Sequence, residues 1–186
     1  MAKPKPILFL ITGPNGAGKT TFAREILTRE LKGMRFLNAD EIARGLSPFD
    51  PPSVAFKAGR LLITEARELI ENKTSFALES TISGIGHTRL IISARKAGYE
   101  VILHFLWLPA PEESIRRVQQ RVKKGGHHVP AADIRRRYPR TFENLVIHYL
   151  PIVNEWFVWQ SQKGHKMLAN HKTHAIHDVA EFLDIQ

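Results

Sequence analysis

The chain has 186 residues, of which 43% are hydrophobic and 24% are charged. This composition is typical of a folded globular protein, and it excludes a disordered, fibrous or low-complexity chain. The absence of cysteine excludes a disulfide framework, a thiolate metal site and a cysteine nucleophile. Lysine and arginine outnumber aspartate and glutamate by 27 to 18, which gives a formal net charge of +9 that needs an explanation.

Apolar periodicity and turn residues predict alternating strands and helices over the first two thirds of the chain. In chain order we expect a strand over residues 7–12, a helix over 19–31 that ends at Gly33, a strand over 34–37, a proline-rich loop over 47–53, a helix over 54–70, a strand over 75–78, a helix over 89–97, a strand over 99–108 and a helix that Pro111 opens. This alternation indicates a parallel sheet covered by helices on both faces.

The final third is less regular. We expect residues 131–150 to be mostly helical despite Pro139, followed by strands over 156–159 and 166–169 and a closing helix over 176–183. Because no linker separates a second domain, we expect a single domain over residues 1–186. No apolar run approaches the roughly 20 residues that a membrane-spanning helix needs, so we expect a cytoplasmic protein without a membrane partner.

The strongest signal is a glycine-rich loop between the first predicted strand and the first predicted helix. The segment GPNGAGKT at residues 13–20 fits the pattern G-x-x-x-x-G-K-[ST], which binds phosphates through backbone N–H groups and a helix N-terminus. We expect Lys19 to reach the β- and γ-phosphates and Thr20 to bind Mg²⁺ through its hydroxyl. The alternative, a glycine-rich turn with a fortuitous lysine, is disfavoured by the strand and helix around it. The expected nucleotide-binding residues are Gly13, Pro14, Asn15, Gly16, Ala17, Gly18, Lys19, Thr20 and Thr21.

A phosphate loop occurs in motors, switches and kinases. A chain of 186 residues leaves no room for the added domains of a typical mechanical ATPase. The sequence has no guanine-reading NKxD-like motif, which disfavours a GTPase switch. The class that remains is a compact nucleotide-dependent phosphotransferase.

Three carboxylates are candidates for the acceptor side of such an enzyme. Asp40 follows the second predicted strand and is suited to take the acceptor's proton, with a role as the cap of a helix over 41–46 as the alternative. Glu79 ends the third strand and is suited to bind Mg²⁺ through water or an acceptor hydroxyl, with a free acid in solvent as the alternative. Glu65 lies within the helix over 54–70, and its spacing alone favours a solvated position.

The positive charge is concentrated in one segment. Residues 116–140 contain nine basic residues and one acid, a local excess of 9 − 1 = +8. Gly125 and Gly126 lie between its two helical parts and suit the hinge of a lid that brings arginines onto a transferred phosphate. A solvated helix face and a nucleic-acid contact surface are the alternatives.

Several segments in this order resemble the zeta toxin family of small P-loop kinases over residues 7–150. They are GPNGAGKTT, NADEIARGLSPFDP, ITEAR, ALESTISG, GYEVILHFLWL, RVKKGGHHVP and IRRRYPRTFENL. The resemblance implies an α/β P-loop NTPase three-layer sandwich with a parallel central sheet, helices on both faces and a helical lid near 116–140. It also implies transfer of a phosphate from ATP or GTP to a sugar hydroxyl, in the toxins on UDP-N-acetylglucosamine. By position it implies roles for Asp40 as catalytic base, for Glu65, Glu79 and Thr81 in substrate contact, and for Arg121 or Arg117 in stabilising the transferred phosphate.

Two positions depart from the family pattern. Its E-G-T-G-R element corresponds here to ESTIS at residues 79–83, so Ser83 stands where a substrate-binding arginine is expected. His127 stands near the second lid arginine of the toxins, although the arginines at 135–137 offer guanidinium groups from the next helix. Both departures concern the acceptor or the lid, so the resemblance does not define the acceptor.

We therefore expect a kinase that uses ATP (or GTP) and Mg²⁺ to phosphorylate a small hydroxyl-bearing acceptor, a sugar or nucleotide sugar. Its expected catalytic residues are Lys19, Asp40 and Arg121. One alternative is a polynucleotide 5′-hydroxyl kinase or nucleic-acid-binding NTPase that uses the basic segment as its contact surface. Another is a toxin-like protein that an antitoxin-like protein partner holds inactive.

Overall fold

The computed structural model describes residues 4–25, 28, 32–126, 128–161 and 164–183. Its centre is a six-stranded sheet with the order β2-β3-β1-β4-β5-β6. The strands are β1 (Ile7–Thr12), β2 (Arg35–Asn38), β3 (Phe76–Ser80), β4 (Glu100–Trp107), β5 (Glu155–Gln160) and β6 (Lys166–Asn170). All neighbours run parallel except β6, which pairs antiparallel with β5. The expected parallel sheet is thus confirmed, with β6 as an antiparallel edge.

The helices follow the predicted order. They are α1 (Lys19–Glu25), α2 (Ala39–Leu46), α3 (Ala55–Glu71), α4 (Thr88–Lys96), α5 (Pro111–Lys123), α6 (Ala131–Asn144) and α7 (Ile176–Phe182). The predicted proline-rich loop contains a short 3₁₀ turn, Pro51–Val54, and α6 accommodates Pro139 as expected. Residues 26–27 and 29–31 of the predicted first helix lie outside the described residues. Within the described ranges, no helix is both long and apolar enough to cross a bilayer.

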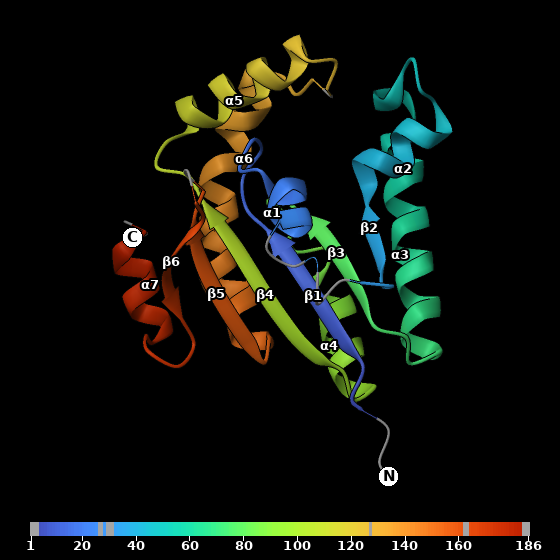
Figure 1. The fold of residues 1–186 in the computed structure, drawn as a ribbon, viewed down its shortest axis with the longest axis vertical. Coiled ribbons are helices and arrows are strands. Elements are labelled where there is room, and N and C mark those ends of the chain that lie inside the picture. The colour runs from blue at the N-terminus through green and yellow to red at the C-terminus, as the bar shows by residue number, and fades with distance from the viewer. Residues whose placement is uncertain (1–3, 26–27, 29–31, 127, 162–163, 184–186) are drawn as a thin grey trace.

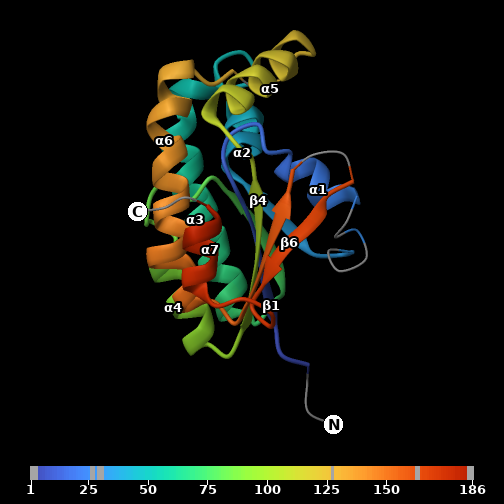
Figure 2. The same ribbon diagram turned by 90° about the vertical axis from the view of Figure 1, so that its left-hand side faces the viewer.

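The two faces of the sheet pack against different helices. Side chains alternate along a strand, so Leu8 and Leu10 of β1 enter one apolar layer while Phe9 and Ile11 enter the other. The larger layer packs against α3, α4, α6 and α7, and the smaller one against α1 (Figures 1 and 2). Helices therefore cover both faces, as the alternating pattern predicts.

The carboxyl ends of β1, β2 and β3 meet at one edge of the sheet. The strand register pairs Glu79 of β3 with Ile11 of β1 on one side and with Asn38 of β2 on the other. The phosphate loop follows β1 at this edge, and α5 and α6 lie over it (Figure 1). Open α/β sheets bind their ligands at such an edge.

The basic segment folds as a helical hairpin of α5 and α6. A small apolar cluster of Val118, Val129 and Ile134 holds the hairpin together. The N–H of Gly125 donates to the carbonyl of Val122, and the N–H of Gly126 donates to the carbonyl of Arg121, both at 2.9 Å. With φ at 79°, Gly125 completes a Schellman cap. The glycine pair thus ends α5, and a hinge at this point stays a prediction.

Candidate active site

Two glycines let the phosphate loop pass close to neighbouring backbone. Gly13 has φ at 138°, and a Cβ on it would lie 2.5 Å from the backbone oxygen of Leu106 in β4. Gly16 has φ at 75°, and its Cβ would lie 2.9 Å from the backbone oxygen of Ser114 in α5. Only glycine fits at both positions, so the loop is packed in a fixed conformation between β4 and α5.

Lys19 begins α1 and folds back over the loop. Its Nζ donates to two backbone oxygens of the loop, at 2.9 and 3.1 Å. Burial lowers the pKa of Lys19, while the carboxylates of Glu79 and Asp40 raise it and the guanidinium of Arg121 lowers it further. The charged residues that the sequence analysis selected therefore lie close enough to act electrostatically on a single buried amine.

Thr20 and Glu79 form the part of the site that fits a metal ion. Thr20 Oγ1 donates a hydrogen bond of 2.8 Å to Glu79 Oε2, because the pairing of β1 with β3 brings the two together. Glu79 is half-buried, so it is not a free acid in solvent. A hydroxyl and a carboxylate are the hard oxygen donors that Mg²⁺ prefers.

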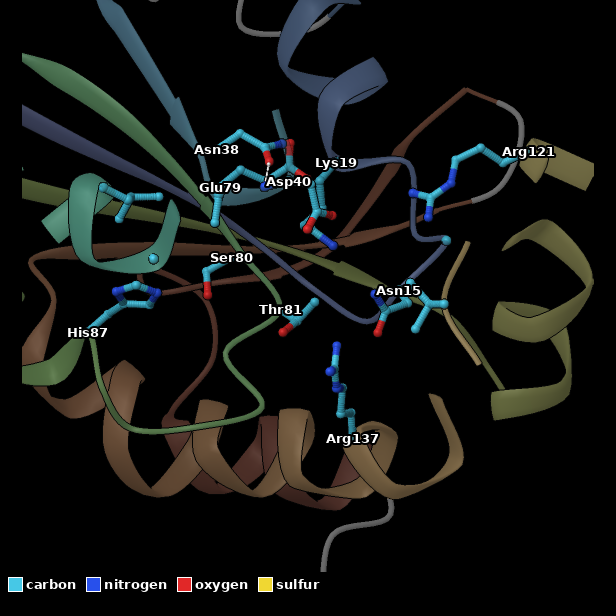
Figure 3. A pocket seen from close by; sticks show the side chains of 15 residues that line it. Asn15, Lys19, Asn38, Asp40, Glu79, Ser80, Thr81, His87, Arg121 and Arg137 are labelled. Atoms are coloured by element: carbon cyan, nitrogen blue, oxygen red, sulfur yellow. Dashed lines mark hydrogen bonds between the residues drawn. The ribbon is translucent and has the colours of Figure 1, made fainter. Parts of the chain in front are cut away.

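Asn38, not Asp40, caps α2. Asn38 Oδ1 accepts the backbone N–H groups of Asp40 at 2.8 Å and of Glu41 at 3.3 Å. The interpretation of Asp40 as a helix cap is therefore wrong, because Asn38 already occupies that position. Asp40 lies in the first turn, where the helix N-terminus favours a carboxylate, and it faces the cavity beside Lys19 (Figure 3).

Two cavities meet at the lysine of the phosphate loop. The first, of about 240 Å³, lies between the strand ends and helices α3, α5 and α6, and Asp40 lines it. The second, of about 410 Å³, lies between the phosphate loop and α5. A donor in the second cavity and an acceptor in the first would therefore meet at a common wall. Four residues line both cavities: Gly16, Lys19, Glu79 and Arg121.

Arg117 and Arg121 occupy different positions on α5. Arg117 lines the second cavity, and its guanidinium donates to Glu113 at 2.7 Å and to Ser161 Oγ at 3.1 Å. Ser161 in turn donates to the backbone oxygen of Ala17 in the phosphate loop. Arg117 thus connects α5 to the loop, whereas Arg121 faces both cavities, which favours Arg121 for the transferred phosphate.

Acids near the basic segment neutralise part of its charge. Glu113 binds both Arg116 and Arg117 at 2.7 Å, and these hydrogen bonds lower the pKa of Glu113 to about 2. Asp133 binds Arg136 at 2.7 Å. The excess of +8 counted over residues 116–140 leaves out the acids just before this segment. The arginines of the hairpin are therefore in part engaged within the molecule.

A family model described as an AAA domain matches residues 8–144. The chain belongs to this family. The match runs from β1 to the end of α6, so it includes the phosphate loop, both cavity-lining carboxylates and the hairpin. A relative of this AAA domain, an uncharacterized protein of Haemophilus influenzae, is 29% identical over 126 residues, which are 68% of this chain and 88% of the relative.

Solved structures share the fold of this AAA domain. The complex of AvrRxo1-ORF1 with AvrRxo1-ORF2 aligns with a TM-score of 0.76 and 20% identity, covering 97% of this chain and 63% of that one. The PezAT chromosomal toxin–antitoxin system of Streptococcus pneumoniae aligns with a TM-score of 0.69 and 20% identity, covering 97% and 78%. These likenesses confirm the P-loop fold and, at the level of fold, the resemblance to the zeta toxin family.

Of the expected substrate residues Thr81 and Glu65, only Thr81 lines the first cavity. Thr81 lines the first cavity, with its hydroxyl 3.1 Å from that of Ser83. Glu65 instead forms an ion pair with Arg35 of β2 and is absent from the cavity lining. Its position therefore supports neither a substrate contact nor a freely solvated side chain. His127 lies outside the described residues.

Sequence reasoning gave no site role to His87 and did not distinguish Arg137 from its neighbours, although both line the first cavity. His87 reaches it from the residue before α4, and Arg137 reaches it from α6 (Figure 3). His87 lies eight residues after Glu79, which is the one signal that it lies at the ligand-binding edge. Arg137 was one of three consecutive arginines, and the sequence offered no means of choosing among them.

Proposed function

We propose that this AAA domain is a kinase that transfers the γ-phosphate of ATP to a hydroxyl group of a small acceptor such as a sugar or a nucleotide sugar. The observation that carries the proposal is the common wall of the two cavities, which contains a lysine, a carboxylate and an arginine. Phosphoryl transfer needs donor and acceptor in line across such a cationic centre. The structure of AvrRxo1-ORF1 with its partner and ATP supports ATP as the donor.

Each residue has a defined part in this proposal. The loop amides and Lys19 bind the phosphates, with Lys19 exchanging its two loop oxygens for phosphate oxygens. Thr20 and Glu79 would hold Mg²⁺, which supplies charge neutralisation at the phosphates. Asp40 accepts the proton of the attacking hydroxyl, and Arg121 stabilises the charge that develops on the transferred group.

The size of the first cavity favours a small acceptor over a polynucleotide. Its volume of about 240 Å³ is below the roughly 300–1,000 Å³ of pockets that enclose drug-sized ligands, so it fits a sugar or the sugar part of a nucleotide sugar. Pairing of the hairpin arginines with nearby acids also reduces the open positive surface that a nucleic acid would contact. The antitoxin-like partner stays a prediction, which the PezAT toxin–antitoxin system supports by its likeness in fold.

The test is phosphate transfer from labelled ATP to a panel of sugars, nucleotide sugars and 5′-hydroxyl oligonucleotides. With the accepted compound, we expect Asp40→Asn to lower kcat by about 10²- to 10⁴-fold, because the general base is lost. Glu41→Gln is the matched control, since Glu41 lies in the same helical turn but outside the acceptor cavity. Full turnover by Asp40→Asn would reject the base, and preference for the oligonucleotides would reject the small acceptor.

A further inference from the structure

The first cavity has a polar wall that the proposed transfer chemistry does not use. Figure 3 shows Arg137 extending from α6 towards Thr81 and Asn15, and His87 extending towards Ser80. The carboxylates and Lys19 lie on the side of the strand ends. The polar wall therefore faces the part of an acceptor that is remote from its reacting hydroxyl.

Arg137 differs from the two arginines that precede it. Arg136 is bound to Asp133 at 2.7 Å, and Arg135 lies 3.7 Å from Glu112. Arg137 lies 4.0 Å from Asp133, at the limit of an ion pair and on an acid that Arg136 already binds. It lines the first cavity and is absent from the lining of the second. Its guanidinium is thus placed for an anion in the acceptor cavity and not for the nucleotide.

Hydrogen bonds fix the helix that carries Arg137. Tyr138 donates to the backbone oxygen of Leu108 at 2.5 Å, and Asn144 Nδ2 donates to the backbone oxygen of Ile82 at 2.9 Å. The first bond anchors α6 to the residue that follows β4, and the second anchors it to the segment that follows β3. The helix that carries Arg137 is therefore held in place before any ligand binds, so binding has to order the side chain but not its backbone.

His87 offers a different kind of contact. Its Nδ1 is buried and has no hydrogen-bond partner within the described residues. Burial lowers the pKa of His87, so the imidazole is neutral at neutral pH. A neutral imidazole pairs with a hydroxyl or another uncharged polar group, and a bound ligand would remove the cost of leaving a buried polar atom unpaired.

We propose that the acceptor is a small hydroxy compound with an anionic group, a carboxylate or a phosphate, that Arg137 binds. The hydroxyl of Thr81 completes the anion site, and His87, beside Ser80, hydrogen-bonds an uncharged polar group of the same compound. This inference rests on the proposed kinase function and names the substrate class of its acceptor cavity. A bidentate guanidinium contact is the geometry that carboxylates and phosphates share.

The kinetic test uses matched acceptors, namely glucose, gluconate and glucose 6-phosphate, and the three-carbon set glycerol, glycerate and glycerol 3-phosphate. We expect anionic members to exceed the neutral member in kcat/KM by about 10- to 100-fold. Arg137→Ala should abolish that preference through KM, and Arg137→Lys should restore part of it. Arg136→Ala removes the same charge one residue away and should leave the preference intact. Comparison of carboxylate with phosphate within each set identifies the anion.

A binding measurement keeps this inference separate from the kinase proposal. Calorimetry with the Asp40→Asn protein and MgADP measures affinity for the same anionic compounds without turnover. Arg137-dependent binding without transfer to any acceptor would reject the kinase proposal and keep the anion site. Equal losses of kcat for neutral and anionic acceptors in Arg137→Ala would overturn the anion site, because they indicate a role on the transferred phosphate. Failure of every anionic compound to bind would overturn it as well.

Discussion

Ile82 combines a strained backbone with a fully packed side chain. Its φ is 47°, in the left-handed region that β-branched residues avoid, yet its side chain is only 2% exposed. Its position corresponds to the second glycine of the E-G-T-G-R element, and its carbonyl accepts the hydrogen bond from Asn144. The cost of the left-handed conformation, about 1–2 kcal/mol, is therefore offset by burial next to the acceptor cavity.

Because of this strain, we expect glycine at position 82 to destabilise the fold less than alanine does, which is the reverse of the usual order. Ile82→Ala should destabilise the fold by about 2–5 kcal/mol, because it removes the buried side chain and keeps the strain. Ile82→Gly removes the same side chain but also the strain, so it should be about 1 kcal/mol less destabilising than Ile82→Ala. Urea unfolding of both variants measures the difference. A lower free energy of unfolding for Ile82→Gly than for Ile82→Ala would show that the left-handed conformation costs nothing here.

At the scale of elements, the start of α2 determines where the proposed base lies. Asn38 ends β2, caps α2 through its side chain and lines the acceptor cavity. Asn38 thus connects the end of β2 to the N-terminus of α2 and fixes the backbone of Asp40. The hairpin of α5 and α6 is joined to the rest in a similar way, because Arg117 connects it to the phosphate loop through Ser161.

Removal of the cap should affect both stability and turnover. We expect Asn38→Ala to cost about 1 kcal/mol of unfolding free energy, because two N–H groups of the first turn lose their acceptor. It should also lower kcat for the accepted substrate, since Asp40 moves with that turn. Asn38→Ser supplies another cap oxygen and should restore most of the stability. Equal unfolding midpoints for Asn38→Ala and the unmodified protein would contradict the role of the cap.

At the scale of the whole molecule, apolar runs and the turn residues around them predicted every strand to within two residues. Strands buried on both faces are continuous apolar runs, so their position is encoded locally. The phosphate loop is also encoded locally, because its residues are contiguous in the sequence, and it was predicted as well. His87 was not predicted, and Arg137 was not distinguished from Arg135 and Arg136, since α6 and the start of α4 reach the cavity only through long-range packing. The sequence also suggested Asp40 as a cap of the helix that follows β2, whereas α2 begins two residues earlier than expected and Asn38 is its cap.

The smaller apolar layer contains a polar side chain whose protonation bears on the stability of the whole fold. His104 of β4 is 6% exposed, with its ring stacked on Phe157, and its Nδ1 accepts a hydrogen bond of 3.1 Å from Trp159 Nε1. The proton of the neutral ring therefore resides on Nε2. Burial lowers the pKa of His104 from 6.5 to about 4. The fold accordingly requires the uncharged form.

This shift predicts a loss of stability in acid. Above pH 6.5 the ring is neutral in both the folded and the unfolded chain, so it has no effect. Between pH 6.5 and 4 only the unfolded chain gains the proton, so unfolding becomes easier as the pH falls, by about 3 kcal/mol in total. Below pH 4 both states are protonated and the loss is complete.

His104→Phe keeps the aromatic packing and should remove this part of the pH dependence. It should also lower stability by a constant amount at every pH, because Trp159 loses its acceptor. Urea unfolding of both proteins from pH 7.5 to 4 separates the two effects, and parallel curves would show that His104 is not the titrating group.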